Sequence, residues 1–471
     1  MLSSTFHRIT WCATVLGVFV MVWGTACAET PASFQAGCAR ECITPPLGVQ
    51  LAGYFHERLA KSVYDDLYAR AVVIESAGVR IALVSCDLIS MTEEVSKAAK
   101  QLIETETGIP AAHIMICATH THTGPELRAD AAVPRDETWT AALPRRIADA
   151  VAHAGAAKVP ATLRAGAAEV TGYSFNRLFR LHDGSEVFGK KSEGKTTLGP
   201  AGPIDPALQT LSAVDKDGRL IALLVNFAMH PDVIGGGKAD FIAADWPGLL
   251  GDTISAVYGE NVVTLLLQGT CGDINHRPHD PTALPTSGPA KAHQLGRALA
   301  GAAILALERA EPMTDPTLDA VTETLAIPYY TRDKAFFEEL NAIEKKENPT
   351  AFEQSLLRRG KAWPYDGKTA AVPVQALRIG EVGLVAFPAE IFVRIGLEVK
   401  QWSESPRTFV VELANARVST YVPDPSQAER DAYGEKPILS RWLDANAGRQ
   451  MADAAIRLVH QLFTKAPEQQ P

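Results

Sequence analysis

Short apolar runs alternate with segments of helical periodicity along most of this chain. The runs lie at 79–86, 114–118, 161–170, 220–228 and 262–268, with helical patterns at about 93–105 and 141–154 between them. Strands that are apolar along their whole length are typical of sheets covered on both faces. We therefore predict an α/β fold of mixed, largely parallel sheets flanked by helices, formed as a single domain.

The N-terminus has the layout of a secretory signal peptide. Arg8 precedes an apolar run at 9–24, and small residues that suit a cleavage site follow the run. This order is typical of a cleaved signal and not of a membrane-spanning helix. We predict a signal peptide at 1–28, a domain at 29–465 and a polar tail at 466–471. The expected location is periplasmic or secreted.

The charge distribution excludes one class of partner. The net charge is −9 over 471 residues and no basic stripe is present, so nucleic acid is not an expected partner. No obligate protein partner is evident. Residues 330–368 are charge-rich and have two helical patterns. We predict an insertion or lid there, and the alternative is a solvated helical hairpin with no role in a site.

Chemically versatile side chains directly follow several predicted strands. His120 and His122 follow the run at 114–118, while His230 and Asp273 follow two later runs. Open α/β sheets place their sites at the carboxyl ends of strands. In an extended backbone, residues two apart point to the same side, so His120 and His122 can face one cavity. Such a pair suits a metal site or an acid–base pair. The alternative is a pair of loop histidines bonded to backbone.

Two residues near the C-terminus stand in similar settings. Glu390 follows an apolar run and a Pro-Ala turn, and Tyr421 precedes a Val-Pro turn. Considered alone, each residue also has an interpretation without a functional role. Glu390 could be a solvated loop acid, and Tyr421 a packed aromatic residue with a satisfied hydroxyl.

Taken together, these pieces resemble the catalytic domain of the neutral/alkaline non-lysosomal ceramidase family. The matching stretches, in the order of that family, are 65–71, 118–125 (ATHTHTGP), 176–177, 226–230, 268–273, 388–390 and Tyr421 with Tyr433. The resemblance implies cleavage of an amide bond and one zinc ion held by His120, His230, Glu390 and Tyr421. It also implies that His122 and Arg177 approach the scissile carbonyl or the product carboxylate.

The implied chemistry agrees with the residue types. Zinc takes nitrogen and oxygen ligands and lowers the pKa of bound water to about 7, which supplies a nucleophile at neutral pH. The candidate catalytic residues are His122, Arg177, Asp273 and Asn275. Asn275 is a departure, because the family has a serine two residues after the aspartate. A mechanism that needs this serine is therefore disfavoured, whereas metal-activated water is not.

These observations lead to one expectation with open alternatives. We expect an exported, zinc-dependent amidohydrolase that cleaves an N-acyl amide, such as a ceramide-like lipid. A small-molecule or lipid substrate is the expected partner, and peripheral contact with membrane lipids is open. The alternatives are an esterase or an N-acyl sugar or amino-acid hydrolase on the same metal site, and a non-catalytic relative that binds lipid or glycan.

Overall fold

The computed structural model describes residues 33–464 apart from 132, 190–196, 279–285 and 431. The chain divides into two units, residues 1–30 and residues 31–471, and the fold below is that of the second unit. The predicted signal peptide and polar tail lie outside the described residues. Among the described helices, none combines the length and the apolar character needed to cross a membrane.

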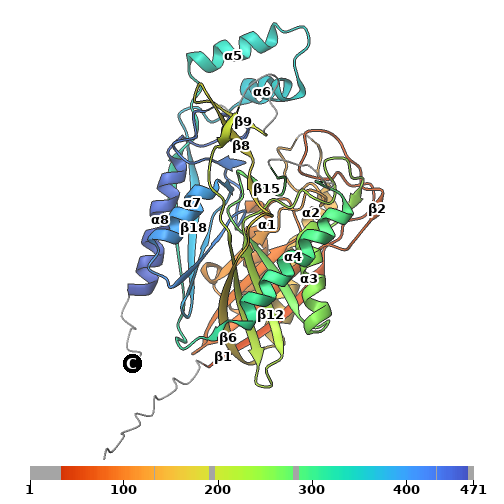
Figure 1. Cartoon of the computed structure of the whole chain (residues 1–471), viewed down its shortest axis with the longest axis vertical. Coiled ribbons are helices and arrows are strands. Elements are labelled where there is room, and N and C mark those ends of the chain that lie inside the picture. The colour runs from red at the N-terminus through yellow and green to blue at the C-terminus, as the bar shows by residue number, and fades with distance from the viewer. Residues whose placement is uncertain (1–32, 132, 190–196, 279–285, 431, 465–471) are drawn as a thin grey trace, which may run out of the picture. The chain divides into compact units, whose positions relative to one another are not determined.

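Nine strands form the larger sheet of the molecule (Figure 1). In spatial order they are β14 (Val263–Gln268), β12 (Leu220–Phe227), β11 (Ala207–Asp215), β6 (Val159–Glu169), β1 (Phe34–Cys42), β3 (Tyr68–Ser76), β4 (Val79–Cys86) and β5 (Ile114–Ala118), with β16 (Glu311–Pro312) paired to β6. Six strand pairs in this sheet are antiparallel. The pairs β12–β14 and β4–β5 are parallel.

The prediction of largely parallel sheets is therefore wrong, since the large sheet is mostly antiparallel. The prediction assumed that strands apolar along their whole length belong to parallel sheets. Here the antiparallel strands are also covered on both faces, by helices on one side and by a second sheet on the other. Burial on both faces, and not strand direction, explains their composition.

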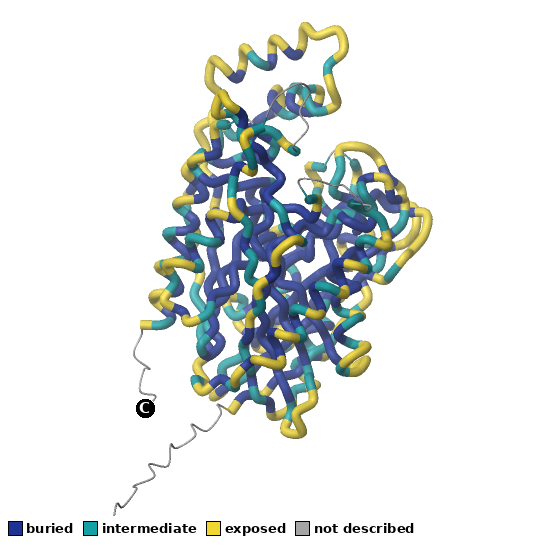
Figure 2. The backbone as a smooth tube through the Cα atoms, viewed as in Figure 1, coloured by how far each residue is buried: buried dark blue, intermediate teal, exposed yellow. Residues whose placement is uncertain are grey.

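A second sheet of four strands packs against the first. Its order is β17 (Leu318–Pro328), β18 (Thr369–Ile379), β19 (Val382–Ala386) and β21 (Arg407–Val411). One buried cluster joins the two sheets, with Leu83 and Leu224 from the large sheet and Leu377, Leu384 and Phe409 from the small sheet. The dark blue backbone in Figure 2 includes these facing strands.

Helices cover the outer faces of both sheets and complete four layers, helix–sheet–sheet–helix. The large sheet is covered by α1 (Glu93–Thr107), α2 (Glu137–Ala156), α3 (Asp245–Tyr258) and α4 (Pro289–Glu308). The small sheet is covered by α7 (Val393–Trp402) and α8 (Ala447–Thr464). Apolar faces at helical spacing, such as Met451, Ala455 and Leu458 in α8, bury each helix against its sheet.

The charged segment at 330–368 forms the helices α5 (Lys334–Glu344) and α6 (Ala351–Ala362) between β17 and β18. Leu340 and Leu356 from these helices share a small apolar cluster with Ile438 and Leu439. The hairpin therefore packs on residues from a later part of the chain and is not simply solvated. Its role as a lid stays a prediction.

Candidate metal centre and active site

The candidate residues meet where parallel strand pairs end. The pairs β4–β5, β12–β14 and β19–β21 each direct two carboxyl ends toward the same edge. His120 follows β5, His230 follows β12, and Glu390 follows β19. The few parallel pairs in the two sheets therefore lead into the site, although most of the large sheet is antiparallel.

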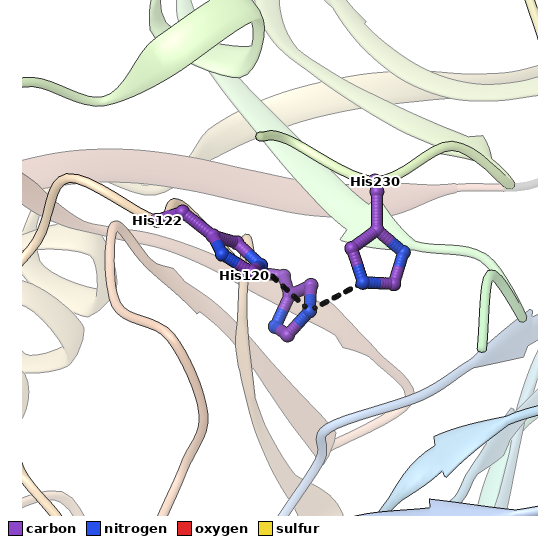
Figure 3. Close-up of side chains that lie close together, drawn as sticks. All are labelled: His120, His122 and His230. Atoms are coloured by element: carbon purple, nitrogen blue, oxygen red, sulfur yellow. Dashed lines mark hydrogen bonds between the residues drawn. The ribbon is translucent and has the colours of Figure 1, made fainter. Parts of the chain in front are cut away.

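Three histidines form the centre of the site (Figure 3). One ring nitrogen from each of His120, His122 and His230 lies within 4.8 Å of the others, and this group could hold a metal ion. His120 Nε2 is 3.1 Å from His230 Nε2 and 3.4 Å from His122 Nε2. His120 and His230 are each 1% exposed.

A turn, and not an extended strand, makes the rings of His120 and His122 converge. His120 has a φ of 72°, in the left-handed region that a non-glycine residue rarely adopts. The backbone N–H of His120 donates to Leu88 O at 2.8 Å, and that of Thr119 donates to Cys86 O at 2.8 Å. These bonds hold a conformation that costs on the order of 1 kcal/mol. Such strain is often retained at functional sites.

The ring nitrogens of His120 and His230 are oriented as metal ligands usually are. His120 Nδ1 lies 2.6 Å from Ile89 O, and His230 Nδ1 lies 2.9 Å from Cys271 O. A carbonyl oxygen only accepts, so each Nδ1 carries the proton and each Nε2 presents a lone pair to the centre. Burial, followed by the charge of Arg177, lowers the pKa of His230 to about 3 and keeps this ring neutral.

Glu390 and Tyr421 reach the same centre from the small-sheet side. The two-residue strands β20 (Glu390–Ile391) and β22 (Tyr421–Val422) pair in parallel, with Glu390 directly opposite Tyr421. Glu390 Oε2 lies 3.3 Å from His120 Nε2 and 3.4 Å from His230 Nε2. Burial, and then the charge of Glu390, raise the pKa of the Tyr421 hydroxyl well above its usual value. The structure thus brings together all four residues for which metal ligation was predicted.

The buried donor atoms fit a divalent metal ion. Glu390 Oε2 is buried without a hydrogen-bond partner among the described residues, and it faces the Nε2 atoms of His120 and His230. Three lone-pair acceptors this close repel one another unless a cation lies among them. Burial acts to raise the pKa of Glu390, and positive charge on His120 and His230 would lower this pKa well below its usual value, so the carboxyl is ionised when a cation lies at the centre. Neutral imidazoles with an ionised carboxylate form a set that divalent metals bind.

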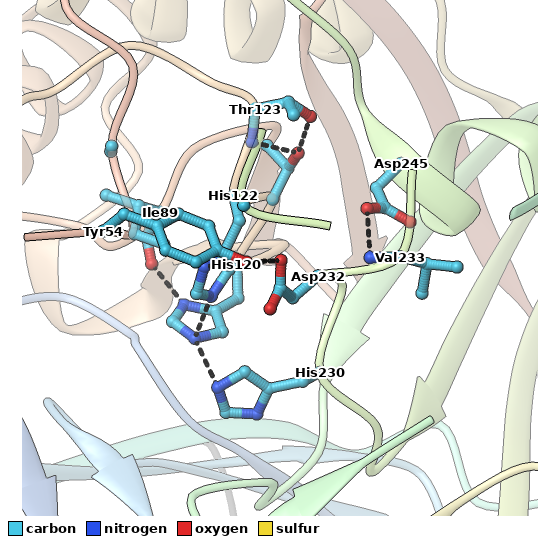
Figure 4. Close-up of polar contacts among 12 residues, drawn as sticks. Tyr54, Ile89, His120, His122, Thr123, His230, Asp232, Val233 and Asp245 are labelled. Atoms are coloured by element: carbon cyan, nitrogen blue, oxygen red, sulfur yellow. Dashed lines mark hydrogen bonds and ion pairs between the residues drawn. The ribbon is translucent and has the colours of Figure 1, made fainter. Parts of the chain in front are cut away.

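His122 differs from the other two histidines in its surroundings. Its Nδ1 faces a carboxylate, lying 4.0 Å from Asp232 Oδ1, and Tyr54 Oη donates to the same oxygen at 2.5 Å (Figure 4). Burial, and then His120, lower the pKa of His122 well below its usual value. Gly53, whose φ is 97°, leaves room for this ring, because a Cβ atom at position 53 would lie only 2.4 Å from His122 Nδ1. The geometry allows His122 to contribute a third nitrogen to a metal or to face a substrate.

Arg177 places a fixed positive charge beside the cluster. Its Nη1 lies 3.3 Å from His230 Nε2, and its Nη2 donates to Tyr421 Oη at 3.1 Å. The guanidinium lies over the rings of Tyr421 and Tyr433, at 5.5 and 5.4 Å from their centroids. Arg177 is 8% exposed, so it could bind an oxygen anion with little competition from water.

Asp273 and Asn275 contact the loops that surround Arg177. Asp273 accepts the Val393 N–H at 2.7 Å and the Asn176 side-chain amide at 2.6 Å, and burial raises its pKa to about 6. Asn275 Oδ1 accepts the Arg277 N–H at 2.9 Å. Neither shows a hydrogen bond to the three histidines in the described part of the chain. Their catalytic roles stay predictions.

Two acids that were not predicted from the sequence also shape the site. Glu412 follows β21; its Oε2 accepts the Ile391 N–H at 2.6 Å and its Oε1 accepts the Cys271 thiol at 3.0 Å. The rule that selected Glu390, an acid after an apolar run, would also have selected Glu412. Asp232 stands two residues after His230, but only the tertiary structure shows that it faces His122.

The fold and the site define an α/β protein with a candidate metal centre at one end of two packed sheets. The family model "Neutral/alkaline non-lysosomal ceramidase, N-terminal" matches residues 34–258, and this segment belongs to that domain family. The matched segment contains His120, His122, Arg177 and His230. Among curated proteins, no match to this chain was found.

Solved structures share the fold over nearly the whole chain. Neutral ceramidase from Pseudomonas aeruginosa matches with a TM-score of 0.73 and 20% sequence identity, covering 94% of this chain and 77% of that chain. A ceramidase described as complexed with C2 matches with a TM-score of 0.72 and 19% identity, covering 93% and 76%. At this identity the similarity shows the fold.

Proposed function

We propose that this chain is a zinc-dependent amidohydrolase of the neutral ceramidase type, which cleaves the N-acyl amide of a ceramide-like lipid. The observation that carries the proposal is the convergence of His120, His230, Glu390 and Tyr421 at one buried point beside Arg177. Membership of the family through residues 34–258 supports the reaction class.

In this proposal His120, His230, Glu390 and Tyr421 hold the zinc ion. When bound, zinc supplies an activated water and polarises the amide carbonyl. His122 and Arg177 lie beside the ligands and donate to the oxygen on which negative charge develops. After cleavage, the Arg177 guanidinium suits the fatty-acid carboxylate, because charge-assisted hydrogen bonds are strong where water is excluded.

Export and contact with membrane lipids are part of the same proposal. The pattern at 1–28 supports export to the periplasm or the medium. A small cavity lined by His120, Glu390 and Tyr421 also has Phe55 on its wall, and Phe55 is 44% exposed. An exposed aromatic side chain beside the site suits an enzyme that draws an amphipathic substrate from a lipid surface.

Metal analysis combined with a substrate panel tests the proposal. The purified protein is assayed for bound zinc and for release of fatty acid from a short-chain ceramide, an N-acyl amino acid and an aryl ester. We expect amide cleavage that a chelator abolishes and added zinc restores. Cleavage of the ester alone would support an esterase. Stoichiometric metal without any hydrolysis would support a binding protein.

A further inference from the structure

A larger cavity of about 470 Å³ adjoins the candidate active site. It shares Arg128, Arg359 and Arg417 with the small cavity of about 60 Å³ that borders His120 and Glu390. Part of the wall of the larger cavity comes from helix α6 and the residues that follow it. The inserted hairpin therefore contributes directly to the surroundings of the site.

The three shared arginines differ in how their charges are compensated. Arg128 donates to both carboxylate oxygens of Glu126, at 2.7 Å each, and Arg417 donates to Asp130 at 2.9 Å. Arg359 has no ion pair within the described residues, and it donates one long hydrogen bond, of 3.4 Å, to Leu439 O. Of the three arginines at the junction of the two cavities, Arg359 is thus the one without an ion pair in the described part of the chain.

The residues around Arg359 partly desolvate its guanidinium group. Burial lowers the pKa of Arg359, with Asp130 acting in the opposite direction and Arg128 adding to the decrease. Trp363 and Trp442 line the same cavity, and Trp442 Nε1 is buried without an acceptor among the described residues. An anion placed here would gain a charge-assisted hydrogen bond and would relieve the desolvation of Arg359.

We propose that Arg359 selects N-acyl amides that carry an acidic group, a carboxylate, sulfonate or phosphate, bound at the junction of the two cavities. The inference rests on the proposed function, because it names the substrate class of the same site. Arg359 borders the small cavity together with His122 and Glu390, so one molecule can place its acidic group at Arg359 and its amide at the catalytic cluster. Arg359 is a specificity-determining residue in this arrangement.

Matched substrates and variants test this selection. N-lauroyl-glycine, N-lauroyl-taurine and N-lauroyl-ethanolamine share the scissile amide and acyl chain, and only the first two are acidic. The measured quantity is the ratio of kcat/KM for each acidic amide to that for the neutral amide. Arg359→Gln removes the charge. Arg358→Gln is the control, because Arg358 is the adjacent, exposed residue on α6 and lines neither cavity.

We expect the wild type to prefer the acidic amides, and Arg359→Gln to lower the ratio roughly tenfold to a hundredfold, as the loss of a charged hydrogen bond predicts. Arg358→Gln should keep the wild-type ratio. Arg359→Glu should favour the cationic N-lauroyl-ethylenediamine instead. The relative rates on the glycine and taurine amides show which acid fits better.

Three outcomes would overturn the inference while the proposed function stands. One is a wild type that prefers the neutral amide, and another is an equal change of the ratio in Arg358→Gln and Arg359→Gln. A third is a zinc-loaded wild type that cleaves a short-chain ceramide and none of these amides. Absence of cleavage of the short-chain ceramide as well would instead contradict the proposed function itself. Because the wild-type preference is measured without any variant, the test does not depend on how well Arg359→Gln folds.

Discussion

The two sheets hold their parts of the candidate metal centre in different ways. On the large-sheet side, His120 and His230 stand in turns after long buried strands, and backbone carbonyls fix both rings. On the small-sheet side, Glu390 and Tyr421 belong to the two-residue strands β20 and β22. A buried side chain, Glu412, supports the segment that contains Glu390.

This difference indicates where the site is rigid and where it depends on single side chains. The histidines are positioned by backbone groups, which a point mutation cannot remove. The carboxylate is positioned partly by one buried acid, whose replacement would loosen Glu390 without disturbing the rings. The largest effects should therefore come from removing a histidine, and smaller ones from removing support on the small-sheet side.

Replacing His230 should have the largest effect. His230→Ala removes a buried lone pair from the centre and should abolish both metal binding and activity, because metal sites rarely tolerate a missing ligand. Metal content by mass spectrometry and fatty-acid release check this. His153→Ala is the control, since His153 is an exposed surface residue paired with Glu41. Stoichiometric metal in His230→Ala would show that the ligand assignment is wrong.

Replacing His122 tests whether it belongs with the other two histidines. His122 Nδ1 lies 4.0 Å from Asp232 Oδ1, too far for a hydrogen bond, so no outer contact among the described residues fixes this ring as backbone carbonyls fix the other two. We therefore expect His122→Ala to keep its metal and to lower kcat roughly a hundredfold, as loss of an oxyanion donor does. Metal content and turnover, measured on the same preparation, separate the two roles. Loss of metal would make His122 a third nitrogen ligand.

Replacing Glu412 tests the support on the small-sheet side. Glu412→Ala should weaken metal affinity roughly tenfold to a hundredfold, the usual cost of removing an outer contact of a ligand segment. Burial raises the pKa of Glu412 well above its usual value, so the side chain is neutral and glutamine is a close substitute. Competition with a metal indicator dye should show affinity near wild type for Glu412→Gln. Equal loss in both variants would show that the carboxyl group itself is needed.

Comparing wild type with Glu412→Gln at several pH values gives a further test, for which the direction of the stability change can be predicted. A carboxyl whose pKa is raised in the folded state contributes stability that is fully present below its unfolded pKa and is lost as the pH rises through the folded value. Wild type should therefore lose stability relative to Glu412→Gln as the pH increases above about 5. Urea unfolding at several pH values, without metal, measures the difference. A constant difference would mean that Glu412 is already ionised in the fold.

Apolar runs and their spacing predicted the strands β4, β5, β6, β12 and β14 and the helices α1, α2, α5 and α6, because burial on one or two faces leaves a clear periodicity. They did not predict β1, β3 and β11 of the same sheet, nor the helices α3 and α4 that cover it. Strand direction could not be predicted in this way, since an antiparallel sheet between helices and a second sheet is equally apolar. The four residues Glu390, Tyr421, His120 and His230 were selected together only through the resemblance to a family. Nothing in their spacing shows that segments so far apart in the chain meet.

The roles of residues that act through tertiary contacts could not be predicted from the sequence either. Asp232, Glu412 and Arg359 carry ordinary local patterns, and their roles depend on which distant groups face them. The insertion shows this most clearly. Its charge suggested a solvated hairpin or a lid, whereas only the tertiary structure places Arg359 at the edge of the site, where it forms no ion pair with any described residue.

Replacing Asn275 should have the smallest effect and bears on the mechanism. Asn275 lies in β15 (Ile274–Asn275), which pairs with β7 (Phe175–Asn176), and its side-chain Oδ1 accepts the Arg277 N–H within its own loop. Asn275→Ser would introduce a hydroxyl without a bonded base to activate it, and a serine needs such a base to act as a nucleophile. We therefore expect a change in kcat of no more than about tenfold, with unchanged sensitivity to a chelator.

Rapid-quench measurements should show no burst of product in wild type or variant. A burst with an isolable acyl-enzyme, or activity that survives complete removal of metal, would contradict a mechanism based on metal-activated water. The large-sheet histidines would then have to serve as acid–base groups instead of ligands.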